Sequence, residues 1–232
     1  MAGLFRNRSG FLTLAGAGLA GLTIVGFAAP GDAATTLLDA VLADVNGAII
    51  TASDATIARG LGLFGFQPAE QPIRADDVSR LVDAWLVDAE AARLQIAPSA
   101  AELEDAWRSV AGRVGGVDAL RRWADRAGLT EAWVRKLVEA DLRGRRFIGI
   151  RFRAFVFVPE EDVLKELGPG PHSLEARAQA IDALREEGVR RELAAWLADA
   201  RSRAVIRTTG EEGTGLPPLF PLPAPAGAAG PR

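Results

Sequence analysis

The order of apolar and polar positions predicts a chain that is mostly helical. Apolar side chains recur every three or four residues in several segments, the spacing that places them on one face of an α-helix. Ser99 and Glu102 have the spacing of a capping box, in which each side chain accepts a hydrogen bond from the other residue's backbone N–H. The helices predicted from these signals cover about 53–62, 76–94, 99–114, 117–127, 130–151, 159–167 and 173–203.

Short strands are predicted at both ends of this helical region. Two apolar runs flank Asn46-Gly47 and predict a β-hairpin over 41–51, because both turn residues tolerate the positive φ of a type I′ turn. A lone hairpin is only marginally stable in water. The stretch AVIRTT at 204–209 has the β-branched, alternating character of a strand. We therefore expect a mainly α fold with a small antiparallel sheet formed by the N-terminal hairpin and a C-terminal strand.

The N-terminal segment 1–34 has the pattern of a secretory signal peptide. Arg6 and Arg8 precede a long uncharged apolar run, and Gly31 and Ala33 are the small residues of a cleavage site. The run approaches the ~20 residues that span a bilayer, so an uncleaved anchor in the inner membrane is the alternative. Either interpretation places the remaining chain in the periplasm.

The C-terminal segment 210–232 is rich in Gly, Pro and Ala. Such a composition buries too little apolar surface to order itself, so we expect a disordered or polyproline-II tail. The helical domain with its closing strand is therefore expected over 35–209.

Composition argues against several classes of function. The formal net charge is −3, whereas nucleic-acid binders usually carry a basic excess. The chain has no cysteine, which excludes disulfides, thiolate catalysis and cysteine-based metal sites. Its one histidine, His172, lies in the breaker-rich loop GPGPHS. The adjacent acidic residues fall at helix starts or on polar faces, where capping and solvation explain them. We expect no catalytic residue, no cofactor and no metal site.

The hairpin segment VNGAIITASD at 45–54 resembles the SurA N-terminal-domain family, which includes periplasmic chaperones and parvulin-type foldases. The Gly-Leu-Thr junction at 128–130, the segment FRAFVFVPEEDVLKEL and the closing ELAAWLADARSRAVIR are similar to family elements in the same order. The resemblance covers about 35–209. It implies an ATP-independent chaperone that binds unfolded envelope or outer-membrane proteins through an apolar crevice.

The chain departs from the family's isomerases in one respect. A parvulin domain between the helical body and the closing helix needs on the order of a hundred residues, as a small domain does. Only 159–173 lie in that interval. We therefore expect no isomerase activity, and a peptidyl-prolyl cis-trans isomerase remains the second alternative. The first alternative is a non-catalytic assembly subunit of an envelope complex, membrane-anchored if the N-terminal segment is not cleaved.

Aromatic residues are the candidates for peptide binding, because their faces hold apolar segments without a fixed register. Phe64 and Phe66 lie among glycines in a predicted loop, where they either plug the core or form a client-binding surface. The tryptophans lie on the apolar stripes of their own helices, so core packing is their other interpretation. The candidate peptide-binding residues are Phe64, Phe66, Trp107, Trp123 and Trp133.

A basic cluster offers one further candidate surface. Arg145, Arg146, Arg151 and Arg153 could meet lipid headgroups or an acidic partner, or form a solvated helix face.

Overall fold

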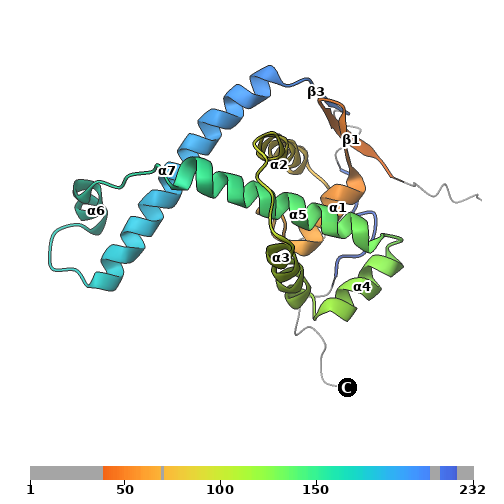
Figure 1. Cartoon of the computed structure of the whole chain (residues 1–232), viewed down its shortest axis with the longest axis horizontal. Helices are drawn as coiled ribbons and strands as arrows, with labels where there is room; N and C mark the ends of the chain where they lie inside the picture. The colour runs from red at the N-terminus through yellow and green to blue at the C-terminus, as the bar shows by residue number, and fades with distance from the viewer. Residues whose placement is uncertain (1–38, 69–70, 210–214, 224–232) are drawn as a thin grey trace, which may run out of the picture. The chain divides into compact units, whose positions relative to one another are not determined.

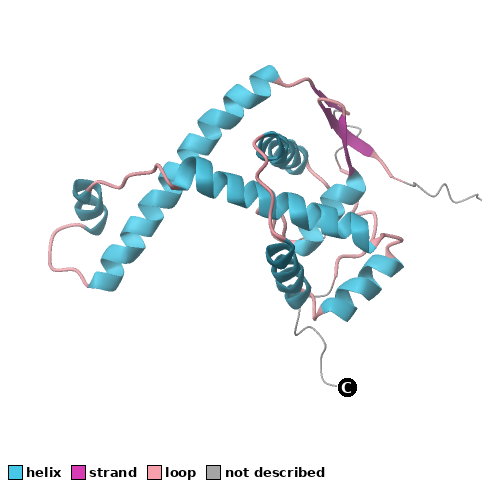
Figure 2. Cartoon of the chain, viewed as in Figure 1, coloured by secondary structure: helices cyan, strands magenta, loops and turns pink. Residues whose placement is uncertain are grey.

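The structure is a computed structural model, which describes residues 39–68, 71–209 and 215–223. The predicted signal peptide or anchor at 1–34 lies outside the described residues. Helices dominate the described part, with three short strands at its edges (Figures 1 and 2). The elements are β1 (Val41–Val45), β2 (Ala48–Thr51), α1 (Ala52–Leu61), α2 (Ala75–Arg93), α3 (Ala100–Arg113), α4 (Val117–Arg126), α5 (Glu131–Ile148), the π-helix η1 (Gly149–Arg153), α6 (Glu160–Leu167), α7 (Leu174–Arg203) and β3 (Ile206–Thr208).

The three strands form one antiparallel sheet in the order β2-β1-β3, which brings both ends of the helical region together (Figure 1). Ala43 of β1 lies opposite Ile50 of β2 and Thr208 of β3. The turn has positive φ at Asn46 (54°) and Gly47 (87°), as a type I′ turn requires. The predicted fold class, mainly α with this small sheet, is confirmed.

The hairpin turn also joins the chain ends directly. The Asn46 N–H donates to the Val205 carbonyl at 2.9 Å, and the Val205 N–H donates to Asn46 Oδ1 at 2.8 Å. The turn residue therefore fixes the entry of β3 as well as the reversal between β1 and β2.

The helix boundaries follow local capping chemistry. Ser99 caps α3 in a capping box with Glu102, as predicted. The predicted start of α1 at 53 took Ser53 as the cap, whereas the cap is Thr51, two residues earlier, which forms a capping box with Asp54. The predicted helix ending near Arg151 continues instead through η1 to Arg153, and the chain leaves helical structure after that turn.

Buried apolar side chains form two clusters. The α1 cluster surrounds α1, every residue of which is buried, and includes side chains from β1, β2 and α2 to α5. The α7 cluster is smaller and contains Val87, Ala91, Phe147, Phe152 and Val189, from α2, α5, η1 and α7. In it the rings of Phe147 and Phe152 meet edge to face with centroids 5.7 Å apart, and Trp196 lies 5.3 Å from Phe147.

The proline-rich segment differs from the sequence expectation of a disordered tail. Residues 215–223 pack against the helical body, and Leu216, Leu219 and Phe220 contact the α1 cluster. The segment forms reciprocal backbone hydrogen bonds with Ile73, which the apolar periodicity used for helices and strands does not reveal. The rest of the predicted tail, 210–214 and 224–232, lies outside the described residues.

Candidate peptide-binding groove

An open apolar groove of about 380 Å³ lies where α2, α5 and α7 meet the loop after α1. We call it the α2/α5/α7 groove. Its position follows from the close packing of α2 on α5, where Gly144 lies against Val87 and a Cβ at residue 144 would be 3.2 Å from Val87 Cγ1. The α7 side chains Leu193 and Leu197 line the groove from the other direction. The remaining lining residues are Phe64, Gly65, Arg80, Asp83, Ala84, Ala140, Asp141, Arg145 and Ile148.

Phe64 is held at this groove in an unusual backbone conformation. Its φ is 52°, in the left-handed region that bulky residues seldom adopt. The Phe64 N–H donates to Asp141 Oδ1 at 2.8 Å, and the ring lies 6.0 Å from Trp85. The buried carboxylate of Asp141 therefore fixes a strained aromatic residue at the groove, and such strain is found preferentially at functional sites.

The charged residues that line the groove already have partners. Arg145 Nη2 lies 2.8 Å from Asp141 Oδ2. Arg201 of α7 binds Asp83 at 2.6 Å. Arg80 donates to the Gly65 carbonyl at 2.9 Å, and its guanidinium lies over the Phe66 ring. Both carboxylates that line the groove are therefore neutralised by arginines, while Arg80 keeps its positive charge and directs its guanidinium to a backbone carbonyl and an aromatic ring.

The other sequence candidate in the loop, Phe66, is buried in the α1 cluster. The sequence left open whether these two phenylalanines fill the core or lie at an accessible surface, and the two residues differ in this respect. Phe66 plugs the core, and Phe64 lines the groove.

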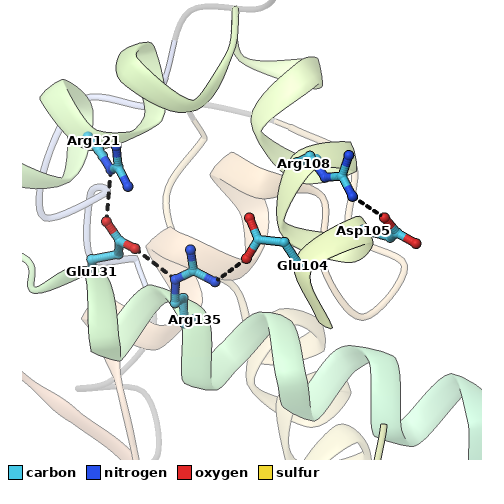
Figure 3. A network of polar contacts seen from close by, with 6 residues as sticks. All are labelled: Glu104, Asp105, Arg108, Arg121, Glu131 and Arg135. Carbon is cyan, nitrogen blue, oxygen red and sulfur yellow. Dashed lines mark hydrogen bonds and ion pairs between the residues drawn. The ribbon is translucent and has the colours of Figure 1, made fainter. Parts of the chain in front are cut away.

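A network of ion pairs joins α3, α4 and α5 (Figure 3). Trp107 packs against one arginine of this network. Glu131 accepts from Arg121 Nε at 2.9 Å and from Arg135 Nε at 2.7 Å. Arg135 also binds Glu104 at 3.1 Å, and its guanidinium lies 4.3 Å from the centre of the Trp107 ring. Trp107 is only 1% exposed, so its ring is covered rather than available to a client.

Hydrogen bonds from these arginines also change the pKa of the Glu131 carboxyl group. Those from Arg135 and then Arg121 lower the pKa of Glu131 below its ordinary value. The carboxylate is also in the first turn of α5, where the helix dipole favours negative charge. Glu131 therefore keeps its negative charge at neutral pH.

The indole N–H groups of Trp133 and Trp123 donate hydrogen bonds to other groups of the same chain. Trp133 is half-buried and donates to Asp54 Oδ1 at 3.0 Å. Trp123 is buried and donates to the Pro221 carbonyl at 2.8 Å. Trp123 thus does contact an extended apolar segment, but that segment is the protein's own.

The sequence analysis missed most of the groove and one exposed surface. In the sequence, Leu193 and Leu197 look like ordinary residues on the apolar face of a long helix. Only the packing of α7 against the rest of the protein places them at the α2/α5/α7 groove. Phe155 and Phe157, which follow η1, are 77% and 83% exposed, and both line a second hollow beside α7. The alternation of apolar residues at 148–158 was the one sequence signal of this surface.

The predicted basic cluster is divided between several partners. Arg145 pairs with Asp141, Arg146 with Glu102 on α3, and Arg153 with Glu186 on α7. Arg151 lines the hollow beside Phe155. The four arginines therefore do not form one basic surface.

Within the described ranges, no three metal-ligating side chains come together, and no helix has the length and apolarity to cross a bilayer. No family model matches the chain, and no curated protein matches it either.

Proposed function

We propose that this protein is an ATP-independent, chaperone-like protein of the periplasm. It holds unfolded segments of envelope or outer-membrane proteins in the α2/α5/α7 groove and does not isomerise prolines. The observation that carries the proposal is the apolar groove itself, which is open and whose two carboxylates are already paired with arginines.

The groove suits a ligand without a fixed sequence. A cavity of about 380 Å³ accommodates a few apolar side chains, since ligand pockets begin at about 300 Å³. Contacts of this size give modest affinity and fast exchange, which a holding protein needs where no ATP drives release. A mostly apolar lining without an unpaired carboxylate lets segments of different sequence use the same surface.

The resemblance to the SurA N-terminal-domain family supports the same function. That resemblance implies a C-terminal strand closing on the N-terminal hairpin, and β3 pairs with β1 in this way. The interval between η1 and α7 holds the short helix α6 and its loops, with too few residues for a parvulin domain. This supports a holding function without an isomerase.

An aggregation assay tests the proposal. The full chain should slow the light scattering of an unfolded porin diluted from urea. Ile148→Asp puts an unpaired charge into the groove and should abolish most of that protection. Ile150→Asp is the matched control, because Ile150 is 52% exposed and belongs to η1 outside the groove. If the wild-type chain gives no protection, or if both variants protect equally well, the proposal is wrong.

The exposed pair Phe155 and Phe157 favours a second candidate, a subunit that binds one envelope partner. Large apolar side chains seldom stay exposed side by side unless they meet a partner. Affinity purification from membranes with wild type and a Phe155→Ser/Phe157→Ser variant distinguishes the two. One stoichiometric partner lost with the variant supports the subunit, whereas many substoichiometric proteins retained by it support the holding function.

A further inference from the structure

The described part of the proline-rich tail packs on a surface of the helical body that we call the tail groove. It is separate from the α2/α5/α7 groove and is formed by one face of α1 together with Ile73 and Trp123. Residues 215–223 read GLPPLFPLP and lie along it.

The first contact is through the backbone. The Gly215 N–H donates to the Ile73 carbonyl at 2.7 Å, and the Ile73 N–H donates to the Leu216 carbonyl at 2.7 Å. Ile73 is fully buried, so this pairing satisfies both polar groups of a residue that solvent does not reach. It fixes the direction and register in which the segment enters the groove.

The next contacts recognise the extended segment through side chains. The Leu219 N–H donates to Thr56 Oγ1 at 3.3 Å. Trp123 donates its indole N–H to the Pro221 carbonyl at 2.8 Å, and its ring meets Phe220 with centroids 5.7 Å apart at 68°. An aromatic side chain that donates to a carbonyl beside proline is how proline-rich segments are recognised, because their carbonyls have few internal donors.

The last contact depends on a missing side chain. Gly60 lies one helical turn after Thr56 on α1, and a Cβ there would be 2.9 Å from Pro223 Cδ and 3.3 Å from Leu222 Cδ2. These closest contacts both belong to the tail. A glycine inside a helix weakens it, so its presence here has a reason in the close approach of the tail.

From these contacts we infer that the tail groove is a reversible binding site for extended, proline-rich apolar peptides, which the protein's own residues 215–223 occupy and thereby gate. The segment follows Thr209 of the same chain after five residues in the sequence, so it is always present near the tail groove. A free peptide of the same kind must therefore compete with the tail. The inference is independent of the holding function proposed above, since it concerns a different surface.

Peptide binding to the full chain tests this inference. The probe is a fluorescently labelled peptide GLPPLFPLPAP, the sequence of 215–225, and the measurement is fluorescence anisotropy. Phe220→Ala removes the ring contact between the tail and Trp123, which weakens the tail's own binding, and should tighten probe binding at least ten-fold over wild type. Pro217→Ala is the matched control, because Pro217 is exposed, and it should bind the probe as wild type does.

A second substitution identifies the site. Gly60→Ala added to Phe220→Ala obstructs the groove for tail and probe alike, while the alanine favours α1. The double variant should lose the ten-fold gain. If Phe220→Ala binds no tighter than wild type, or if the double variant keeps the gain, the inference is overturned. Sedimentation of the wild-type chain is a further check. A mass that doubles with concentration would indicate that the tail of one copy binds the groove of another, and would contradict the inference that each tail occupies the groove of its own chain.

Hydrogen exchange on the wild-type chain needs no variant. A reversible gate opens without global unfolding, so the amides of Gly215 and Leu219 should exchange at least a hundred-fold faster than that of Leu81 in the α1 cluster. Equal protection at these positions would make the tail a permanent part of the fold and would contradict the inference.

Discussion

The α1 cluster encloses its central helix completely, whereas the α7 cluster leaves neighbouring phenylalanines in solvent. Every residue of α1 is buried beneath the sheet, the helices and the docked tail. The α7 cluster has five buried residues, and Phe155 and Phe157 beside it are 77% and 83% exposed. Both regions are rich in aromatic residues, so aromatic content alone does not identify a binding surface.

The difference lies in how each region is closed. Segments distant in sequence cover the α1 cluster: β3 pairs with β1, and the tail lies on α1. The α7 cluster is covered by α7 and the short segment around η1, and the 30 residues of α7 bury few side chains. The α1 cluster therefore supplies stability, and the region around α7 supplies accessible apolar surface.

Truncation of the enclosed Trp107 should have the largest effect on stability. Trp107→Ala removes a ring that is 1% exposed and covered by Arg135, so the free energy of unfolding should fall by about 3–5 kcal/mol. Urea denaturation followed by circular dichroism measures it. Phe157→Ala is the matched control and should change the same quantity by less than about 0.5 kcal/mol. Equal losses in the two variants would break the contrast between the regions.

A glycine in α7 tests how tightly the smaller cluster is packed. A Cβ at Gly188 would lie 2.6 Å from Val156 Cγ1, so Gly188→Ala should destabilise by about 1–2 kcal/mol despite its better helix propensity. Val156→Ala in the same chain removes the obstruction. The double variant should then be more stable than Val156→Ala alone by about 1 kcal/mol. Additive effects in this double-mutant cycle would contradict the packing described here.

The sequence predicted these regions best where the stabilising interactions join residues that are close along the chain. Apolar periodicity and caps such as Ser99 with Glu102 are local, and the helices they predicted are present. The hairpin and its distant strand were also predictable, because a lone hairpin needs a partner and 204–209 was the segment with strand character. The cap of α1 was misplaced because Thr51 and Ser53 are both good capping residues and only the register of β2 decides between them.

The candidate site was less predictable, because exposure depends on residues far along the chain. Trp107 and Trp123 lie on similar helical stripes, yet Arg135 covers one and the tail covers the other. The docking of 215–223 depends on the absence of a side chain at Gly60, which has no periodic signature. Phe64 and Phe66 were both candidates because neither had a stripe to join, and that local argument could not tell that Phe64 lines the groove while Phe66 is buried.

The pH dependence of stability sharpens the account of the α1 cluster. Burial raises the pKa of Asp54 above its ordinary value, although hydrogen bonds from Thr51 and Trp133 oppose the shift. The folded state therefore holds this proton more tightly than the unfolded state does. The resulting stability is complete below about pH 4, near the unfolded pKa, and is lost as the pH rises through the raised pKa.

Asp54→Asn isolates this contribution, because the variant cannot titrate at residue 54. The stability of wild type minus that of the variant, from urea unfolding at several pH values, should decrease between about pH 4 and pH 7. The sign of the change is the test, whatever the variant costs through its altered capping box. A difference that is constant or increases with pH would contradict the burial of this carboxyl group.

The ion-pair network over Trp107 should contribute least (Figure 3). Glu131→Gln weakens the bonds to Arg121 and Arg135 at the protein surface, so we expect a loss of about 0.2–1 kcal/mol at low salt. Screening should reduce that loss in 1 M sodium chloride. The control is Glu161→Gln in the first turn of α6, away from this network, and a salt-independent loss at Glu131 would contradict an electrostatic origin.

Site-specific photo-crosslinking tests the central claim, that the α2/α5/α7 groove holds unfolded segments. A photoreactive phenylalanine analogue at Phe64 reports from within the groove, and the same analogue at exposed Arg108 on α3 is the control. With an unfolded porin present, the account predicts crosslinks at residue 64, few at 108, and loss of those at 64 when Ile148→Asp is added. Porin that crosslinks at 108 as strongly as at 64, or not at all at 64, would contradict it.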